Sequence, residues 1–243
     1  MSDARKVLAL TGGDRISFLQ GLVTNNISAE ATGLVYAALL TPQGKFIADF
    51  FVLPEADRLL IDVAESHAAA LAQRLAMYRL RADVQIAKTE IAVSRGTGDA
   101  PEGAFPDPRH PALGWRAYGG GAASDDTDWN ALYVAHMIPQ TGEELTPDTF
   151  ILEAGFERLH GIDFRKGCYV GQEIAARMKH KTELKKGLKQ VQIHGDAKTG
   201  DLITANGKPA GTLHSVSGDL GIAYLRFDRT DDMQTEHAKL SLT

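Results

Sequence analysis

The only cysteine of the chain, Cys168, lies in the stretch Arg165–Lys181, which reads RKGCYVGQEIAARMKHK. Gly167 and Gly171 bracket it at short spacing, and glycines permit backbone conformations that other residues avoid. The residues that follow, up to Met178, are mostly good helix formers. The pattern therefore predicts that the thiol lies on a turn shortly before the N-terminus of a helix.

Two cations, Arg165 and Lys166, precede this cysteine. Neighbouring cations and the partial positive charge at a helix N-terminus both favour the thiolate form over the thiol. By residue type alone, a single cysteine is more often a small buried apolar residue. Two roles for Cys168 therefore stand side by side, a reactive thiolate and a structural core residue.

A single cysteine excludes an intrachain disulfide and every zinc site built on pairs of cysteines. The net charge of −5 provides no overall positive field, so we expect no nucleic-acid partner. No apolar run reaches the length of about 18 residues that a membrane helix needs, and we expect no membrane contact. The first residues, MSDARKVLAL, lead directly into a strand-like segment, from which we expect a cytoplasmic protein.

Alternating apolar segments predict a mixed α+β organisation for the first part of the chain. Pro42, Gln43 and Gly44 have the composition of a tight turn and predict a hairpin between the two strands around them. Ser66 is expected to cap the second helix. The predicted strands are 7–10, 34–41, 45–53, 58–63, 84–89 and 91–94, and the predicted helices are 15–23 and 67–80.

Residues 96–121 hold four of the nine prolines and seven glycines, so we expect a long connection or inserted loop with little regular structure. A helix is predicted at 125–137. Beyond Leu184, short alternating segments separated by glycine-rich turns predict a small all-β barrel or sandwich. These segments are 188–193, 202–205, 208–215 and 220–227. We therefore expect two domains, 1–183 and 184–243.

The segment KGCYVGQE, followed shortly by AARM, resembles the signature of the YgfZ-type folate-binding proteins. These proteins are relatives of the glycine-cleavage aminomethyltransferase and include a mitochondrial factor for the maturation of 4Fe-4S proteins. Further similar landmarks are FLQGLVTNN at 18–26, LLTPQGKFIADF at 39–50 and FILEAGFERLHGIDFRKGCYVGQE at 150–173. The resemblance implies an aminomethyltransferase-like folate-binding fold of class α+β, in which ferredoxin-like subdomains and a C-terminal β-barrel surround a channel for tetrahydrofolate.

The same resemblance implies several folate contacts. Glu153, in the segment LEAG, matches a carboxylate that hydrogen-bonds the pterin ring, and two carboxylate oxygens suit the adjacent N–H donors of that ring. Arg177 is a candidate for the glutamate tail of folate, and Tyr169 and Gln172 of the signature are further candidates. The nearby lysines are better explained as a solvated face; they are Lys179, Lys181, Lys185, Lys186 and Lys189.

One position departs from the aminomethyltransferase pattern. Those enzymes carry paired aspartates in the segment that matches GKFIADF, and here Ala48 replaces the first while Asp49 remains. An aspartate at this place acts near the folate nitrogen that receives the one-carbon unit. Asp49 is therefore a catalytic candidate, but the loss of half the pair argues against aminomethyl transfer.

The leading functional hypothesis is a tetrahydrofolate-binding accessory factor for the assembly or repair of iron–sulfur (4Fe-4S) proteins, acting through Cys168. A 2Fe-2S cluster takes about four protein ligands, so Cys168 could supply one ligand and a partner the others. The expected partners are A-type carrier-like assembly proteins and client 4Fe-4S enzymes. The alternatives are a folate-dependent one-carbon transferase and an accessory protein in tRNA modification.

Overall fold

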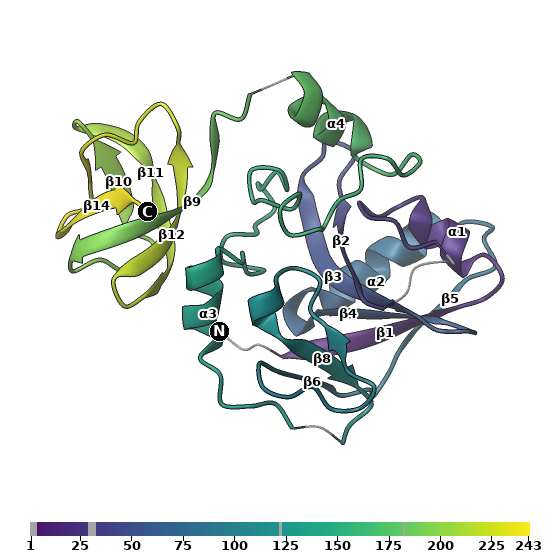
Figure 1. Ribbon diagram of the computed structural model, residues 1–243. Helices are drawn as coiled ribbons and strands as arrows, with labels where there is room; N and C mark the ends of the chain where they lie inside the picture. Colours follow the sequence, from purple (N-terminus) through teal and green to yellow (C-terminus); the bar gives the residue numbers. More distant parts are fainter. Residues whose placement is uncertain (1–3, 29–32, 122, 182) are drawn as a thin grey trace. The chain divides into compact units, whose positions relative to one another are not determined.

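The computed structural model describes residues 4–28, 33–121, 123–181 and 183–243. The chain divides into two compact units (Figure 1). The first unit comprises Met1–Thr127 and Phe156–Ile174, and the second comprises Asp128–Gly155 and Ala175–Thr243. The sequence predicted two domains, 1–183 and 184–243. That division concerns which parts of the chain fold independently, and it stays a prediction.

The first unit is built on a five-stranded sheet in which every neighbouring pair is antiparallel. The strand order is β2-β3-β4-β1-β5. Five predicted strands are confirmed with small changes at their ends. They are β1 (Arg5–Thr11), β2 (Val35–Leu40), β3 (Phe46–Pro54), β4 (Leu59–Ala64) and β5 (Gln85–Lys88).

The predicted hairpin between β2 and β3 is confirmed. Thr41 donates from its backbone N–H to the Lys45 carbonyl at 2.8 Å, and Gly44 takes a φ of +74°, which glycine adopts without strain. The composition Pro-Gln-Gly thus predicted a real turn because the local geometry itself needs a glycine there.

Two helices accompany the sheet, α1 (Arg15–Gln20) and α2 (Glu65–Arg79). The prediction that Ser66 caps α2 is wrong, since the helix starts at Glu65 and has no side-chain cap. Strand β4 runs directly into α2, and the first N–H, that of Glu65, donates to the Ala4 carbonyl at 2.9 Å. A backbone acceptor from the neighbouring strand end thus takes the place of a capping side chain.

Both faces of this sheet are buried, and successive side chains of β3 point to opposite faces. Ala48, Phe50 and Val52 belong to the apolar core that includes the inner residues of α2. Asp49 and Phe51, at the alternate positions, therefore point to the other face. That face carries the polar groups described below.

A second, three-stranded sheet belongs to the same unit and has the order β6-β8-β7. The expectation of little regular structure at 96–121 is therefore partly wrong. Buried side chains in this segment anchor it to the five-stranded sheet, and such tertiary pairing outweighs a composition rich in proline and glycine. The elements are β6 (Val93–Gly96), β7 (Phe105–Pro106), the 3-10 helix η1 (Pro111–Leu113) and β8 (Trp115–Tyr118).

The second unit contains a closed β-barrel, as predicted for the C-terminal part. Its strand order is β10-β11-β12-β9-β14-β13, and α3 (Trp129–His136) packs on β11 and β12. The predictions did not include the last two strands, which are short. The strands are β9 (Lys186–Gly195), β10 (Leu202–Ala205), β11 (Lys208–Ser217), β12 (Leu220–Arg226), β13 (Met233–Gln234) and β14 (Ala238–Leu242).

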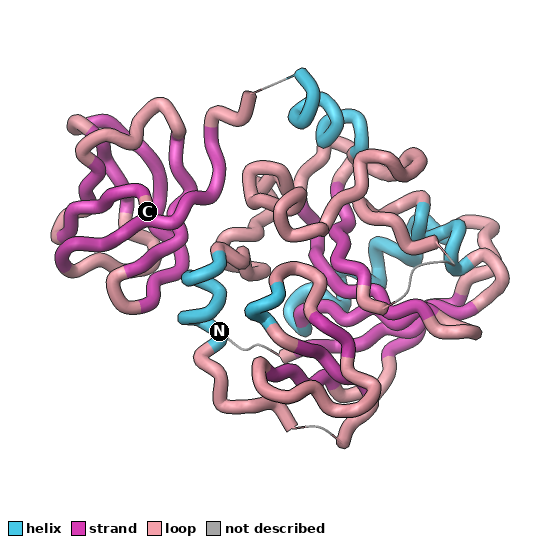
Figure 2. The backbone as a smooth tube through the Cα atoms, viewed as in Figure 1, coloured by secondary structure: helices cyan, strands magenta, loops and turns pink. Residues whose placement is uncertain are grey.

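Between α3 and α4 (Gln172–Lys181) the chain forms turns and irregular segments, drawn as loops in Figure 2. Cys168 lies in this region, and α4 begins four residues after it, which confirms the predicted helix. In the part of the chain that the structure describes, no helix has the length and apolar character needed to cross a membrane.

Candidate functional site

Cys168 is exposed and has a free thiol. The segment around it docks on the β2–β3 turn through Gly171, whose φ is +84°. A Cβ at Gly171 would lie 2.7 Å from the Thr41 carbonyl oxygen and 3.2 Å from the Gly44 Cα. Gly167 has open space around it, so only the second of the two bracketing glycines is required by the structure.

The sequence suggested that Lys166 stabilises the Cys168 thiolate, but its ammonium is directed to other groups. Its side chain is buried, and its ammonium donates to the backbone carbonyls of Gln20 (2.8 Å), the last residue of α1, and of Val23 and Asn25 (3.0 Å), just beyond it. Burial lowers the pKa of Lys166 to about 8, against an opposing effect of Asp163. This cation therefore fastens the cysteine segment to the loop after α1.

Tyr169 completes that attachment. Its ring is buried, and its centre lies 5.1 Å from the Lys166 ammonium, a cation–π contact. Burial raises the pKa of Tyr169 to about 12, so the phenol stays protonated at neutral pH. Gln172, the first residue of α4, is half-buried and donates from its backbone N–H to the Tyr169 carbonyl at 3.2 Å. The exposed Cys168 thus follows a buried lysine and precedes a buried tyrosine.

Asp49 lies on β3 and is buried, 5% exposed. The Tyr36 hydroxyl donates to its carboxylate at 3.0 Å. Burial and then the Asp49 carboxylate hold the pKa of Tyr36 well above its usual range, so Tyr36 remains a donor. The Tyr36 ring also packs against Phe51 and Phe156, with ring centres 5.3 and 5.1 Å apart.

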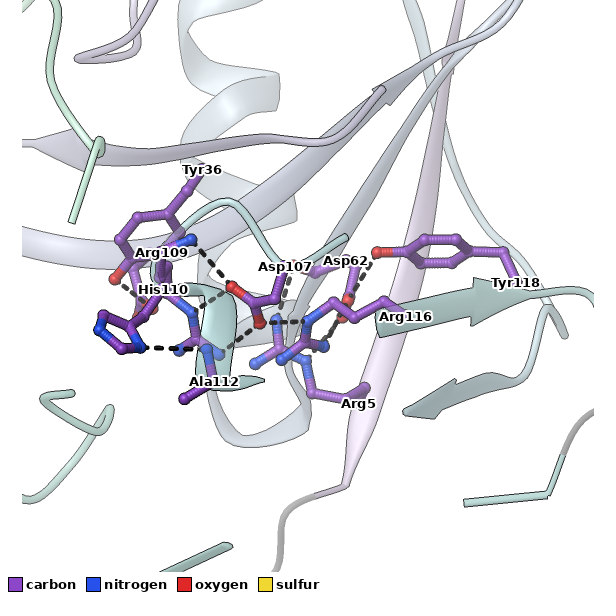
Figure 3. A network of polar contacts seen from close by, with 10 residues as sticks. Arg5, Tyr36, Asp62, Asp107, Arg109, His110, Ala112, Arg116 and Tyr118 are labelled. Atoms are coloured by element: carbon purple, nitrogen blue, oxygen red, sulfur yellow. Dashed lines mark hydrogen bonds and ion pairs between the residues drawn. The ribbon is translucent and has the colours of Figure 1, made fainter. Parts of the chain in front are cut away.

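A buried ion network lies beside this pair (Figure 3). Asp107 accepts two hydrogen bonds from the Arg109 guanidinium, at 3.0 and 2.8 Å, and one from Arg116 Nε at 3.1 Å. Burial alone would raise the pKa of Asp107, but Arg109 and Arg116 hold it far below its usual range. Arg109 and Arg116 also lie over the Phe51 ring, 4.9 and 4.0 Å from its centre.

Arg116 joins this cluster to the five-stranded sheet. Its Nη1 donates to Asp62 on β4 at 3.1 Å, and Asp62 also accepts from Arg5 on β1 at 2.6 Å and from the Tyr118 hydroxyl at 3.0 Å. Burial opposes ionisation of Asp62, yet Arg5 and Arg116 lower its pKa. The three-stranded sheet is therefore held to the main sheet by charges that are removed from water.

The predictions from sequence missed this network. A signal was present, because Asp62 interrupts an apolar strand and Arg116 stands between Trp115 and Tyr118, where an unpaired charge would be costly. The identity of the partners could not be read from spacing, since Arg5, Asp62 and Arg116 come from distant parts of the chain.

Glu153 belongs to the second unit and is half-buried. Its Oε2 accepts a hydrogen bond from the Tyr224 hydroxyl of β12 at 2.7 Å, and its backbone carbonyl accepts from the Leu188 N–H of β9 at 2.8 Å. A Cβ at Gly187 would come within 2.8 Å of the same carbonyl. Strands β9 and β12 thus fix Glu153 in place. Tyr224 was not among the predicted site residues, although its strand was predicted.

The predicted site residues fall into two groups. Cys168, Tyr169, Gln172 and Asp49 belong to the first unit, whereas Glu153 and the exposed Arg177 belong to the second. In the described ranges no group of three or more His, Cys, Asp and Glu side chains is arranged to hold a metal ion.

Comparison with known proteins finds a family model that matches the C-terminal part of the chain and relatives that cover most of its length. The family model of the CAF17 C-terminal beta-barrel domain matches residues 185–243. The mitochondrial iron-sulfur cluster assembly factor IBA57 homolog of Neurospora crassa is 31% identical over 223 residues, covering 75% of this chain and 51% of that protein. The IBA57 protein of Homo sapiens is 28% identical, with 92% of this chain and 76% of that protein covered. The chain spans about half the length of the first of these relatives.

The fold has a solved counterpart in the glycine cleavage system aminomethyltransferase T from Bartonella henselae. The TM-score is 0.78 at 13% sequence identity, over 98% of this chain and 82% of that one. The predicted fold class is confirmed, an α+β aminomethyltransferase-like fold with a C-terminal barrel of six strands.

The expected cytoplasmic location is contradicted, because the named relatives are mitochondrial proteins. That expectation was drawn from the first residues of the sequence, which do not distinguish one aqueous compartment from another. The predicted resemblance to YgfZ-type proteins is supported at the level of the fold, while the relatives themselves carry the name IBA57. Over most of its length this chain is thus similar to the IBA57-type iron–sulfur cluster assembly factors, and its fold is that of an aminomethyltransferase.

Proposed function

We propose that this protein is a tetrahydrofolate-binding accessory factor that assists the assembly or repair of 4Fe-4S proteins through Cys168. The observation that carries the proposal is the presentation of the cysteine. Its thiol is exposed, while Lys166 and Gly171 hold the segment on both sides against the first unit. A buried structural cysteine would need no such support.

The names of the relatives agree with this role, since the IBA57 proteins of Neurospora crassa and Homo sapiens are iron–sulfur cluster assembly factors. The single exposed thiol fits one ligand of a 2Fe-2S cluster that a partner completes, because such clusters take about four protein ligands. The partner class that follows is an A-type carrier-like protein, and the recipients are client 4Fe-4S enzymes. The cluster is then cargo that passes between proteins.

Folate binding is the second part of the proposal. The Glu153 carboxylate can accept from the adjacent N–H donors of a pterin, and one of its oxygens has no hydrogen-bond partner in the described part of the chain. Tyr224 holds the other oxygen and so orients the group. Arg177 is exposed, and its guanidinium suits the carboxylates of a glutamate tail. Tyr169 and Gln172 stay weaker candidates because their side chains are buried or half-buried in the first unit.

A folate-dependent one-carbon transferase is the alternative, and the surroundings of Asp49 argue against it. A catalytic carboxylate must reach its substrate, whereas Asp49 is 5% exposed and accepts from Tyr36. Ala48, the neighbouring residue, provides no second carboxylate. We therefore favour a non-enzymatic role.

A role in tRNA modification is the third possibility. Lys185 and Lys186 are exposed at the start of β9, but a chain with a net charge of −5 lacks the broad basic surface that tight RNA binding uses. We expect no tight tRNA binding at physiological salt. A gel shift that was abolished by removing both lysine charges would support this third role instead.

The decisive experiment is complementation with Cys168→Ser. In cells that lack the native protein, we expect the variant to fold and to bind tetrahydrofolate but not to support 4Fe-4S enzyme activity. Serine keeps the size and hydrogen-bonding capacity of the side chain, so a loss points to thiolate chemistry or metal ligation. Full complementation by the serine variant would remove Cys168 from the function. Turnover of methylene-tetrahydrofolate by the purified protein, with plausible aminomethyl donors, would instead support the transferase.

A further inference from the structure

The outward face of helix α2 carries several exposed apolar residues, with the polar Gln73 among them. Ala69, Ala70 and Ala76 are exposed on it, and Met77 is 64% exposed. Leu80, directly after the helix, is 89% exposed. Helical spacing places these residues on one side, opposite the buried Leu71 and Leu75. Two of the four exposed large apolar side chains found in the described residues thus lie within one helical turn of each other.

The backbone of Leu80 makes this exposure harder to explain by folding alone. Leu80 has a φ of +42° and a ψ of −102°, a backbone conformation that residues other than glycine rarely adopt. A glycine after the helix would satisfy the turn without strain and without exposing an isobutyl group. The leucine side chain is nearly all in solvent, so packing within the chain does not account for it.

Three of the four charged residues from the C-terminal half of α2 to Asp83 are arginines; Asp83 itself is exposed and accepts from the Gly13 N–H at 2.9 Å. Arg74, Arg79 and Arg81 are exposed beside Met77 and Leu80. Arg79 donates to the Val84 carbonyl at 3.5 Å, whereas Arg74 and Arg81 form no ion pair with described residues. The only acidic residue of α2, Glu65, lies at the opposite end and pairs with Lys6 at 3.6 Å. Arginines therefore outnumber acidic residues beside Met77 and Leu80, on a chain whose net charge is negative.

We propose that this face of α2, with Leu80, is a docking surface for an acidic protein, which packs an apolar helix stripe on Met77 and Leu80 and pairs carboxylates with the arginines. The exposed alanines keep the surface flat, so a second helix can approach closely. A face of this size gives a weak and salt-sensitive complex.

Two other occupants fit less well. A second copy of the chain that docked through the same face would bring arginines against arginines. A membrane surface is usually bound through a larger set of bulky apolar side chains, whereas this face offers two among alanines. Both occupants can be distinguished in the same experiment.

The test uses the full chain and a synthetic helical peptide of about 20 residues, with leucines along one stripe and glutamates elsewhere. One control peptide has the same composition with the leucines dispersed, and another has lysine in place of glutamate. Binding is followed by the methyl NMR signal of Met77 and by fluorescence titration at two salt concentrations. We expect only the first peptide to bind, to shift the Met77 signal, and to bind more weakly at high salt.

Leu80→Gly is the main variant. It removes the apolar group and relieves the backbone strain, so thermal stability should not fall, while peptide binding should weaken about tenfold or more. Leu202→Ser changes another exposed leucine, on β10 and 74% exposed, and should leave binding unchanged. Arg74→Gln combined with Arg81→Gln should weaken binding and remove most of its salt dependence.

Several results would overturn the proposal. One is equal binding by wild type and Leu80→Gly, and another is equal binding of all three peptides. Self-association of the wild type that Leu80→Gly abolishes would assign the face to a second copy. Binding to vesicles of phosphatidylglycerol and phosphatidylcholine that Leu80→Gly abolishes, without peptide binding, would assign it to a membrane surface.

Discussion

The ammonium of Lys166 lies 5.1 Å from the centre of the Tyr169 ring, so the residues that enclose Gly167 and Cys168 in sequence also meet in space. The same ammonium donates to three backbone carbonyls at the end of α1 and in the loop after it. This arrangement turns a glycine-rich segment into a supported loop with an exposed thiol.

Replacing Lys166 should therefore loosen the loop and destabilise the first unit. Lys166→Met keeps the length and apolar stem of the side chain but leaves three carbonyls without their charged donor, and we expect a loss of about 2–4 kcal/mol in the free energy of unfolding. Urea unfolding measures this. Lys166→Arg is the matched control and should lose less, because it keeps the charge and the donors. Equal losses in both variants would show that the fit of the ammonium is what matters.

The exposure of Cys168 predicts ready alkylation in the folded protein. With iodoacetamide near neutral pH, the rate in buffer should lie within about one order of magnitude of the rate in urea. Mass spectrometry follows the reaction on a single site, since the chain has one cysteine. Alkylation that occurs only in urea would mean that the folded protein protects the thiol, and it would weaken the proposed role of Cys168.

If Glu153 binds the pterin, Glu153→Ala should weaken tetrahydrofolate binding by about 1–3 kcal/mol through the loss of charge-assisted hydrogen bonds. Tyr224→Phe should have a smaller effect, about 0.5–1.5 kcal/mol, because it removes only the hydroxyl that orients Glu153. Isothermal calorimetry gives both values. Unchanged affinity in a well-folded Glu153→Ala protein would remove the residue from the site.

The ion network should be sensitive to the loss of one member. Asp107→Asn leaves the buried Arg109 and Arg116 with one fewer compensating charge, and we expect a loss of about 3–5 kcal/mol in stability. Asp228→Asn, which breaks an exposed pair with Arg226, should cause no measurable change. Thermal unfolding of the two variants provides the comparison, and similar stabilities would argue that the buried charges are dispensable.

The same network predicts acid sensitivity. Although burial opposes ionisation, Arg5 and Arg116 lower the pKa of Asp62 in the folded protein. The unfolded chain therefore binds a proton more readily, and the contribution of Asp62 to stability is complete above about pH 4 and is lost as the pH falls below it. Unfolding free energies measured from pH 6 to pH 2 should decrease in this window. In Asp62→Asn the decrease should be smaller.

Local patterns predicted a large part of this protein. The Pro42-Gln43-Gly44 turn, the strands around it and the helix after Cys168 all follow from short-range preferences of backbone and side chain. Alternation of apolar residues likewise predicted four of the six barrel strands. Of the missed strands, β13 has only two residues and gives no pattern of its own, whereas β14 does alternate, with Ala238 and Leu240 buried; both pair to close the barrel.

Other features depended on residues that meet only when the chain folds. The Ala4 carbonyl accepts the hydrogen bond at the start of α2, where Ser66 was expected to act as the cap. The acceptors of Lys166 lie about 140 residues earlier in the chain, and Arg116 donates to Asp62 on a distant strand. A buried charge reveals in sequence that a partner must exist, because an unpaired one is costly, but not which residue provides it. The sequence alone thus determined the fold class, the hairpin and the conspicuous cysteine. Tertiary structure decided that Cys168 is exposed, that Asp49 is enclosed and that Glu153 is held by Tyr224, because each depends on contacts between segments that sequence spacing does not encode.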